Sequence, residues 1–154
     1  MIPITLTYSP LTSNLCMCAE CDSSVRSLCA VLLRRNLPLG EPMLLTRLKT
    51  QLQMDLKSGL LRSLTEERAD YIRFLLCDTI AELAQITLYR DEWPELLPFL
   101  QQLAVSNEPK HRESALVILG KIGDALPDVH AGSLESLVDV FARYRSSRLG
   151  FMTH

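Results

Sequence analysis

The sequence lacks both a long apolar run and an excess of either charge. Its longest apolar runs, such as residues 30–33, are far too short to span a bilayer. The formal net charge is only −2, whereas nucleic-acid-binding proteins normally present a basic patch. Apolar residues make up 47% and charged residues 22% of the chain, which indicates a globular rather than a disordered protein. We therefore expect no membrane partner and no nucleic-acid partner.

The residues that usually carry out catalysis are scarce. None of the three histidines, His111, His130 and His154, has a Cys or Ser at a spacing that predicts a nucleophile–base pair. A Gly-rich phosphate loop is also missing. Gly120 and Gly123 fall within or at the end of a predicted helix, where Gly allows close packing or caps the helix. We therefore expect a protein that is not an enzyme and that binds no cofactor.

The five cysteines do not predict disulfide bonds, because their number is odd and two lie inside predicted helices. Cys16, Cys18 and Cys21 form a C-x-C-x-x-C cluster. Zinc normally takes four ligands, and no His or fourth Cys is near, so free thiols are favoured over a metal site. Residues 1–10 lack the basic start and apolar core of a secretory signal. We expect a cytoplasmic and nuclear protein with reduced thiols.

What the sequence does contain is a repeated helical pattern. Arg26, Arg73 and Arg112 are each followed by an apolar residue three and seven positions later, and they lie 47 and 39 residues apart. In the third copy, one helix face collects Ala115, Leu116, Leu119 and Ile122. A period of about 40–47 residues is typical of HEAT or armadillo repeats. The sequence thus predicts an all-α fold, an α-solenoid of about three HEAT helix pairs.

Hydrophobic periodicity and turn residues place the individual helices. We expect helices over about 24–35, 43–64, 66–88, 109–125 and 132–144. A further helix, the fourth, is expected to start within residues 91–95, with Pro94 near its first turn, and to carry Leu96, Leu97, Phe99, Leu100 and Leu103. Asp22 or Ser23 is expected to cap the first helix, and Thr65 the third. Pro98 is expected to bend the fourth helix. The buried faces are expected to include Met54 in the second helix, and Leu134, Leu137, Val138 and Phe141 in the last.

These helices define the expected domain organisation. Residues 1–22 form an irregular leader, residues 23–145 form the HEAT array, and residues 146–154 form a disordered tail. The array then consists of a second helix alone, two full helix pairs and the first helix of another pair. We expect the chain to begin and end within an array, with exposed faces at both ends that tend to associate.

Two sets of charged residues each allow two interpretations. The repeated Arg26, Arg73 and Arg112 are expected to bridge to an acid of the neighbouring repeat rather than to contact a partner. Asp78 and Glu82 lie four residues apart on a face that also carries Arg73 and Gln85 and is expected to be exposed. This face is expected to be a solvated surface, and the alternative is an acidic strip for a basic partner.

Four stretches resemble a known family in their sequence, order and separation: residues 24–35, 77–84, 92–100 and 112–116. They are similar to the N-terminal repeats of importin-β (karyopherin-β) nuclear transport receptors, closest to the importin-4/importin-5 branch, over about residues 23–142. The resemblance implies a HEAT array that binds the GTPase Ran in its GTP form and releases cargo proteins that carry basic localisation signals. It also implies docking of Phe-Gly nucleoporins between the outer helices.

The resemblance further implies where partners bind. The second helix of each pair lines the inner surface in this family, which corresponds here to residues 24–35, 66–88 and 109–125. Asp78, Glu82 and Glu113 are then the expected contacts for Ran or cargo. The alternative is a HEAT scaffold or adaptor subunit of another complex that does not bind Ran. A redox or metal protein that uses Cys16, Cys18 and Cys21 is a third class.

Overall fold

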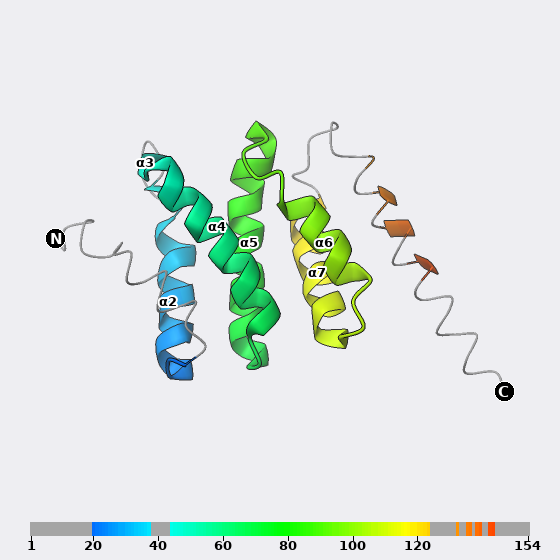
Figure 1. Cartoon of the computed structure of the whole chain (residues 1–154), viewed down its shortest axis with the longest axis horizontal. Coiled ribbons are helices and arrows are strands. Elements are labelled where there is room, and N and C mark those ends of the chain that lie inside the picture. Colours follow the sequence, from blue (N-terminus) through cyan, green and yellow to red (C-terminus); the bar gives the residue numbers. More distant parts are fainter. Residues whose placement is uncertain are drawn as a thin grey trace. The chain divides into compact units, whose positions relative to one another are not determined.

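A computed structural model describes residues 20–37 and 44–123, together with 132, 135, 136, 138, 139, 142 and 143. Every element bounded within these residues is a helix (Figure 1): α2 (Ser23–Asn36), α3 (Leu44–Arg47), α4 (Thr50–Glu66), α5 (Asp70–Thr87), the 3-10 turn η2 (Leu88–Arg90), α6 (Leu96–Ala104) and α7 (Pro109–Ile122). None of the described helices combines the length and apolar character needed to cross a membrane. The described part is therefore all-α, as predicted.

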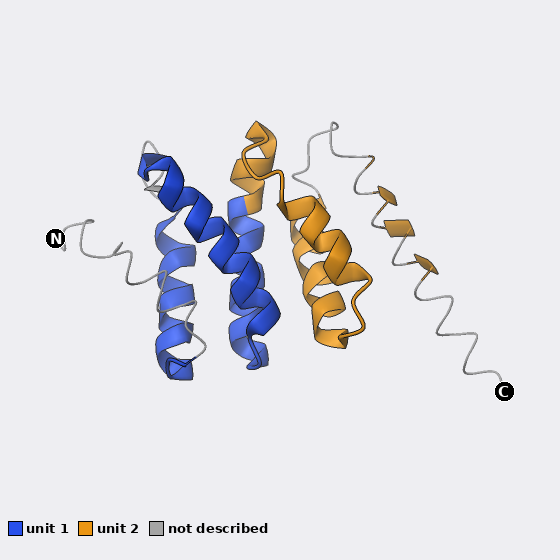
Figure 2. Ribbon diagram, in the orientation of Figure 1, with its two compact units in different colours: residues 1–83 blue, residues 84–154 orange. Residues whose placement is uncertain are grey.

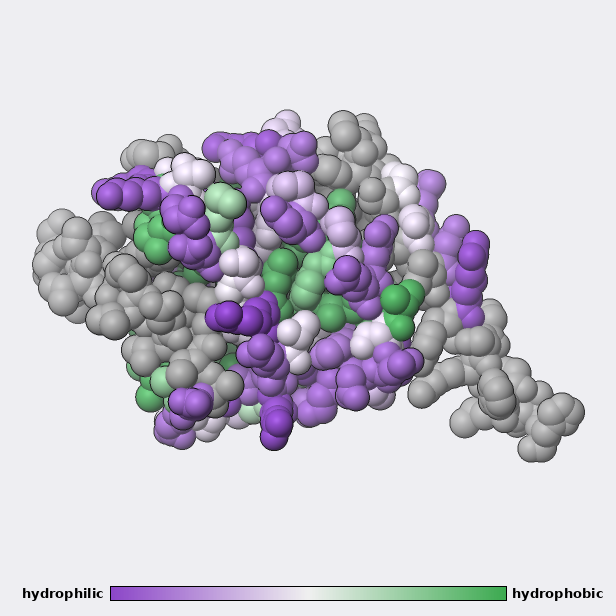
Figure 3. Space-filling view, viewed as in Figure 1, coloured by the Kyte–Doolittle hydropathy of each residue, from purple (hydrophilic) through white to green (hydrophobic). Residues whose placement is uncertain are grey.

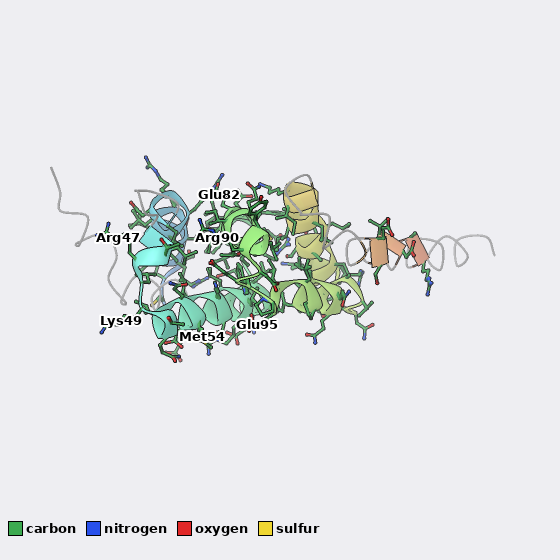
Figure 4. All side chains as sticks on the ribbon, turned by 90° about the horizontal axis from the view of Figure 1, so that it is seen from above. Arg47, Lys49, Met54, Glu82, Arg90 and Glu95 are labelled. Carbon is green, nitrogen blue, oxygen red and sulfur yellow. The ribbon has the colours of Figure 1, made fainter. Side chains whose placement is uncertain are left out.

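The chain divides into two compact units, residues 1–83 and 84–154, and the boundary falls inside α5 (Figure 2). In the first unit, α4 forms one layer and α2 and α5 form the other. Figure 4 shows these layers from above, with Met54 on α4 and Glu82 on α5 on opposite sides. In the second unit, α6 packs against α7.

Helix α2 matches its predicted bounds to within one residue at each end, but its buried face is different. Leu28, Val31 and Leu32 are expected to share a face, yet Leu28 is 59% exposed. The buried residues of α2 are instead Cys29, Ala30 and Leu33. Both stripes are apolar at helical spacing, so the period of the sequence alone did not separate them.

The start of α2 also differs from the prediction in one detail. Asp22 occupies the N-cap position, but its side chain makes no bond to the backbone of the first turn. It accepts a hydrogen bond from the Ser24 hydroxyl instead. That hydrogen bond lowers the pKa of Asp22.

The predicted helix over 43–64 is interrupted, so that α3 ends at Arg47 and α4 begins at Thr50. Lys49 has an extended backbone (φ −58°, ψ 142°). The side-chain amide of Gln53 donates to the Leu48 carbonyl at 2.9 Å, so this carbonyl keeps a partner where the helical bonding stops.

Met54, expected to widen the buried stripe of the second helix, is 56% exposed on α4. The face of the molecule seen in Figure 3 is largely hydrophilic over the described residues.

The boundary between α4 and α5 lies later than predicted. Helix α4 continues to Glu66, and α5 starts only at Asp70. The Thr65 hydroxyl therefore donates to the Arg62 carbonyl in the last turn of α4 instead of capping the next helix. Glu67 takes an extended conformation that ends α4, and its carboxylate accepts from the Ala69 N–H at 2.9 Å.

The second unit is built around the fully buried Trp93, which is 1% exposed. Helix α6 begins at Leu96, so Pro98 stands in its first turn, where the missing N–H has no intrahelical partner to lose. Pro98 therefore does not interrupt the backbone hydrogen bonds of α6, and the predicted cause of a bend at this residue is wrong. Pro109 opens α7, as predicted.

Two residues of the C-terminal part are expected to be buried but are exposed. Leu116, assigned to the buried face of α7, is 52% exposed, and Val138 is 59% exposed. Gly120 and Gly123 have open space around the position of a Cβ atom, and Gly123 has an ordinary right-handed backbone. Neither glycine therefore serves close packing, but Gly123 is the C-cap residue of α7, as expected, and its N–H donates to the Leu119 carbonyl. Leu134, Leu137 and Phe141 lie outside the described residues, as do most of the predicted leader and all of the predicted tail.

Candidate binding surface on helices α2 and α5

Asp78 and Glu82 lie one turn apart on α5, and both interact with Arg34 of α2. The Arg34 Nη1 donates to Asp78 Oδ2 at 3.0 Å, and its Nε donates to Glu82 Oε1 at 2.8 Å. All three side chains are partly exposed, by 38% for Arg34, 21% for Asp78 and 39% for Glu82. We call these three residues the Arg34 cluster. It links two helices of neighbouring repeats.

The Arg34 cluster carries one net negative charge at neutral pH, from two carboxylates and one guanidinium. The hydrogen bond to Glu82 raises the pKa of Arg34, so this guanidinium stays charged. Because the cluster has a net negative charge and is partly exposed, its surface complements a cationic group better than an anionic one. Ion pairs at such exposure contribute about 0–1 kcal/mol each to stability, so the cluster is not a strong structural link.

The structure brings together two of the three residues predicted to contact a partner. Asp78 and Glu82 share the Arg34 cluster, whereas Glu113 is exposed on α7 in the second unit. The sequence prediction missed Arg34 as a member, because a basic residue in the last turn of a helix is already accounted for by the helix dipole. The pairing of Arg26 with an acid of the next repeat was predicted, and the same logic applied to Arg34 would have found it.

The prediction for Arg26 is confirmed. Its Nε donates to Glu67 Oε2 at 2.9 Å, and its Nη2 donates to Glu67 Oε1 at 3.1 Å, across 41 residues of sequence. A further hydrogen bond runs from Arg26 Nη1 to the Cys21 carbonyl. Burial acts to raise the pKa of Glu67, but the hydrogen bonds from Arg26 and from the Ala69 N–H outweigh burial and lower it.

The other two repeated arginines are more buried than expected. Arg73, predicted on an exposed face, is only 1% exposed, and its guanidinium lies 4.6 Å from the centre of the Phe74 ring. Its Nη2 contacts Asp70 Oδ1 of the same helix at 3.4 Å. Arg112 is 7% exposed and donates from Nη1 to the Ser106 carbonyl at 2.6 Å. Arg26 and Arg112 thus both hold the carbonyl of the turn before their own helix.

A serine and a histidine meet in the second unit, although their spacing did not predict it. Ser106 Oγ lies 3.0 Å from His111 Nδ1, and it also accepts from the Glu108 N–H at 3.2 Å. These bonds surround the first turn of α7, which begins at Pro109. The pair therefore orders the turn that precedes α7, as a serine turn does, whereas the N-cap residue Glu108 makes no side-chain capping bond.

The cysteine prediction is only partly covered by the structure. Cys16 and Cys18 lie outside the described residues, while Cys21, Cys29 and Cys77 are thiols rather than disulfides. Burial raises the pKa of Cys29, so this thiol is a poor nucleophile at neutral pH. Among the described residues, no group of three or more His, Cys, Asp or Glu side chains is placed to hold a metal ion.

Comparison with known proteins agrees with this architecture. A family model described as "IPO5-like, TPR repeats" matches residues 68–146. Importin subunit beta-3 of Saccharomyces cerevisiae is 34% identical over 121 residues, which cover 73% of this chain and 11% of the relative. A probable importin-5 homologue of Dictyostelium discoideum is 34% identical over 105 residues, 67% of this chain and 10% of the relative. The chain thus spans about a tenth of the length of these relatives.

Solved structures show the same fold. The karyopherin Kap121p, bound to the extreme C-terminus of the protein phosphatase Cdc14p, matches 82% of this chain and 12% of its own length, with a TM-score of 0.64 and 32% identity. Kap121p bound to Nup53p matches 98% of this chain and 18% of its own length, with a TM-score of 0.63 and 23% identity.

Helix pairs that are joined to the next pair by ion pairs define a helical-repeat protein. The fold is an α-solenoid of about three HEAT-type helix pairs, as the sequence predicts. The chain belongs to the importin-β (karyopherin-β) family, within its importin-5-like group.

Proposed function

We propose that this chain acts in nuclear import by binding Ran in its GTP form, and cargo, through the Arg34 cluster and Glu113. The observation that carries the proposal is the half-exposed acid pair, Asp78 and Glu82, on a repeat helix of an importin-β family chain. A basic segment of a partner is the complementary chemistry for this pair. Glu113 supplies a further exposed carboxylate on α7.

Three further proposals rest on the same relatives. Cargo with basic localisation signals and Phe-Gly nucleoporins are proposed partners, in keeping with Kap121p, which has been crystallised with Cdc14p and with Nup53p. Shuttling between cytoplasm and nucleus is the corresponding localisation. A binding role without catalysis is supported by the names of the relatives, which are importins.

The test is a binding titration of the full chain against Ran loaded with a non-hydrolysable GTP analogue and against Ran-GDP. We expect binding that depends on the nucleotide and weakens with added salt. Reversal of both acids, Asp78→Lys with Glu82→Lys, is expected to weaken binding about tenfold or more, because a rim of matching charge becomes repulsive. Glu113→Lys tests the second contact independently.

A matched control separates partner binding from damage to the fold. Arg34→Gln breaks the same two ion pairs as the double reversal but leaves both acids in place. If the acids contact a basic partner, Arg34→Gln keeps or strengthens binding while the double reversal abolishes it. Equal loss in both variants would show that the cluster matters only for the fold.

The alternative is a HEAT scaffold or adaptor that does not bind Ran. Its support is the Arg34 cluster itself, because both acids already have a cationic partner within the chain. A folded chain that binds neither nucleotide form of Ran would favour this alternative. Circular dichroism of the same sample establishes that the chain is helical.

A further inference from the structure

Helix α5 carries a continuous exposed stripe. Tyr71, Phe74, Asp78 and Glu82 follow one another at intervals of three or four residues, so their side chains share one face of the helix. Tyr71 is 53% and Phe74 36% exposed, and both acids are partly exposed. We call these four residues the aromatic–acid stripe. It extends for about 16 Å along α5, given the rise of an α-helix.

The exposure of this face is shared by the repeats. When Arg26, Arg73 and Arg112 are aligned, each position of the stripe has a counterpart on α2 and on α7. The counterparts are Ser24, Ser27, Val31 and Arg35 on α2, and Lys110, Glu113, Val117 and Lys121 on α7. Every one of these positions is exposed or half-buried, as is every position of the stripe itself. Because α5 stands between the two other helices in the sequence, its stripe does not lie beside either end of the described residues.

The residue types of the stripe are found on α5 and not on its equivalents. The counterparts include no aromatic residue, and α2 carries a cation, Arg35, at the position of Glu82. A residue type that the stacking of repeats required would recur from one repeat to the next. Stacking therefore does not account for two aromatic side chains on an exposed face. Aromatic residues are enriched at the centres of protein interfaces, which favours a role in contact with a partner.

The two halves of the stripe differ in chemistry. The Phe74 ring is held by Arg73, whose guanidinium lies 4.6 Å from the ring centre, so little freedom is lost when a partner covers the ring. Two turns further along α5, Arg34 donates to Oε1 of Glu82, and the Glu82 side chain remains 39% exposed. A cation from a partner can therefore reach this carboxylate while Arg34 stays in place. The stripe thus offers an apolar surface at one end and negative charge at the other.

We propose that the aromatic–acid stripe binds an amphipathic helix of a partner protein, with aliphatic residues against Tyr71 and Phe74 and a basic residue against Glu82. The acid pair selects a basic residue over an acidic one. A straight stripe with helical spacing matches a second helix turn by turn, because both rise by about 1.5 Å per residue. This inference rests on the binding role proposed above for Asp78 and Glu82, and it adds the apolar half of that site.

The test is a fluorescence anisotropy titration of the full chain with a labelled, Ala-rich peptide of about 20 residues, which is long enough to form a helix in water. One face of this peptide carries two Leu near one end and two Arg near the other. A second peptide has Ser in place of both Leu and keeps the charge, and a third has a central Pro that interrupts the helix. We expect the first peptide to bind about tenfold more tightly than either of the others.

Variants of the chain locate the contact. Tyr71→Ser is expected to weaken binding of the Leu peptide about tenfold and to leave binding of the Ser peptide unchanged, because only the Leu side chains meet the ring. Tyr71→Phe keeps the ring and is expected to keep the affinity. Tyr89→Ser is the matched control, because Tyr89 is 76% exposed but lies in η2, outside the stripe. Circular dichroism of each variant establishes that it is folded.

Three outcomes overturn the proposal. The first is equal binding of all three peptides, and the second is equal affinity of the wild type and Tyr71→Ser for the Leu peptide. The third is a loss in Tyr89→Ser as large as that in Tyr71→Ser.

Ran binding by the same samples separates this inference from the proposed function. Peptide binding that depends on Tyr71, in a chain that binds neither nucleotide form of Ran, supports the stripe and rejects the proposed function. Nucleotide-dependent binding of Ran by a chain that does not bind the Leu peptide does the reverse.

Discussion

Glu67 shows how a single side chain joins two repeats. Its carboxylate accepts two hydrogen bonds from Arg26 and one from the Ala69 N–H, at 2.9 to 3.1 Å. Arg26 belongs to α2, and Ala69 directly precedes α5. The carboxylate side chain is 6% exposed, so the ion pair is screened far less than one on the surface. Glu67 therefore fixes the start of α5 relative to α2.

The pH dependence of stability tests this role. The folded-state pKa of Glu67 lies below its ordinary value of 4.5, so its contribution is present above that pH and is lost as the pH falls through the folded value. Glu67→Gln is expected to lower the free energy of unfolding by about 1–3 kcal/mol near neutral pH. Urea titrations are expected to show a smaller difference from wild type under strongly acidic conditions. Glu66→Gln, an exposed neighbour, is the control, and a difference that does not change with pH would contradict the assignment.

At the scale of the element, α7 begins with two devices. Pro109 occupies the first turn, where its missing N–H costs nothing. Ser106 supplies the oxygen that accepts the Glu108 N–H, and it is hydrogen-bonded to His111 Nδ1. The carbonyl of Ser106 is held by Arg112. The turn before α7 is thus ordered by bonds from the helix that it starts.

Ser106→Ala is expected to lower the free energy of unfolding by about 0.5–1.5 kcal/mol, the usual net contribution of a hydrogen bond, because the Glu108 N–H and His111 lose their bonds to this hydroxyl. Ser106→Thr keeps the hydroxyl and is expected to retain most of that stability. Thermal melts followed by circular dichroism measure both. A serine that matters only for the surface would give the same melting temperature in all three chains.

At the scale of the whole molecule, α5 is the element that belongs to both units. The boundary after Leu83 falls within its continuous hydrogen-bonded helix. Gln85 lies just beyond the boundary and is exposed, and its side-chain amide donates to the Lys121 carbonyl at 3.1 Å in the second unit. The two units therefore share a backbone, and damage to α5 is expected to reach both.

Gln85→Pro removes a backbone donor from α5 and clashes with the preceding turn, at a cost of about 3 kcal/mol or more. We expect amide hydrogen exchange to accelerate in both units together. Gln85→Ala removes the contact with Lys121 without harm to the helix, and it is expected to leave exchange in the first unit unchanged. Faster exchange confined to the second unit in the proline variant would show that the units unfold independently.

The all-α class, the positions of α2, α5 and α7, and the pairing of Arg26 with an acid of the next repeat follow from the sequence. The reason is that a helix face buried in a stack must repeat apolar residues at helical spacing. Arg26 was recognised because its offsets recur around Arg73 and Arg112. Asp78 and Glu82 were placed on one helix face by the same spacing rule.

Tertiary packing decided the rest. Leu28 and Leu116 are exposed, while Ala30 and Cys77 are buried at positions equivalent to that of Leu116. The spacing of apolar residues shows that a helix has an apolar stripe, but the neighbouring helices decide which part of that stripe is buried. Arg34 reached Asp78 and Glu82 for the same reason, because a contact across 44 and 48 residues depends on how two helices pack. The local sequence around each residue does not specify which residues of another helix it will contact.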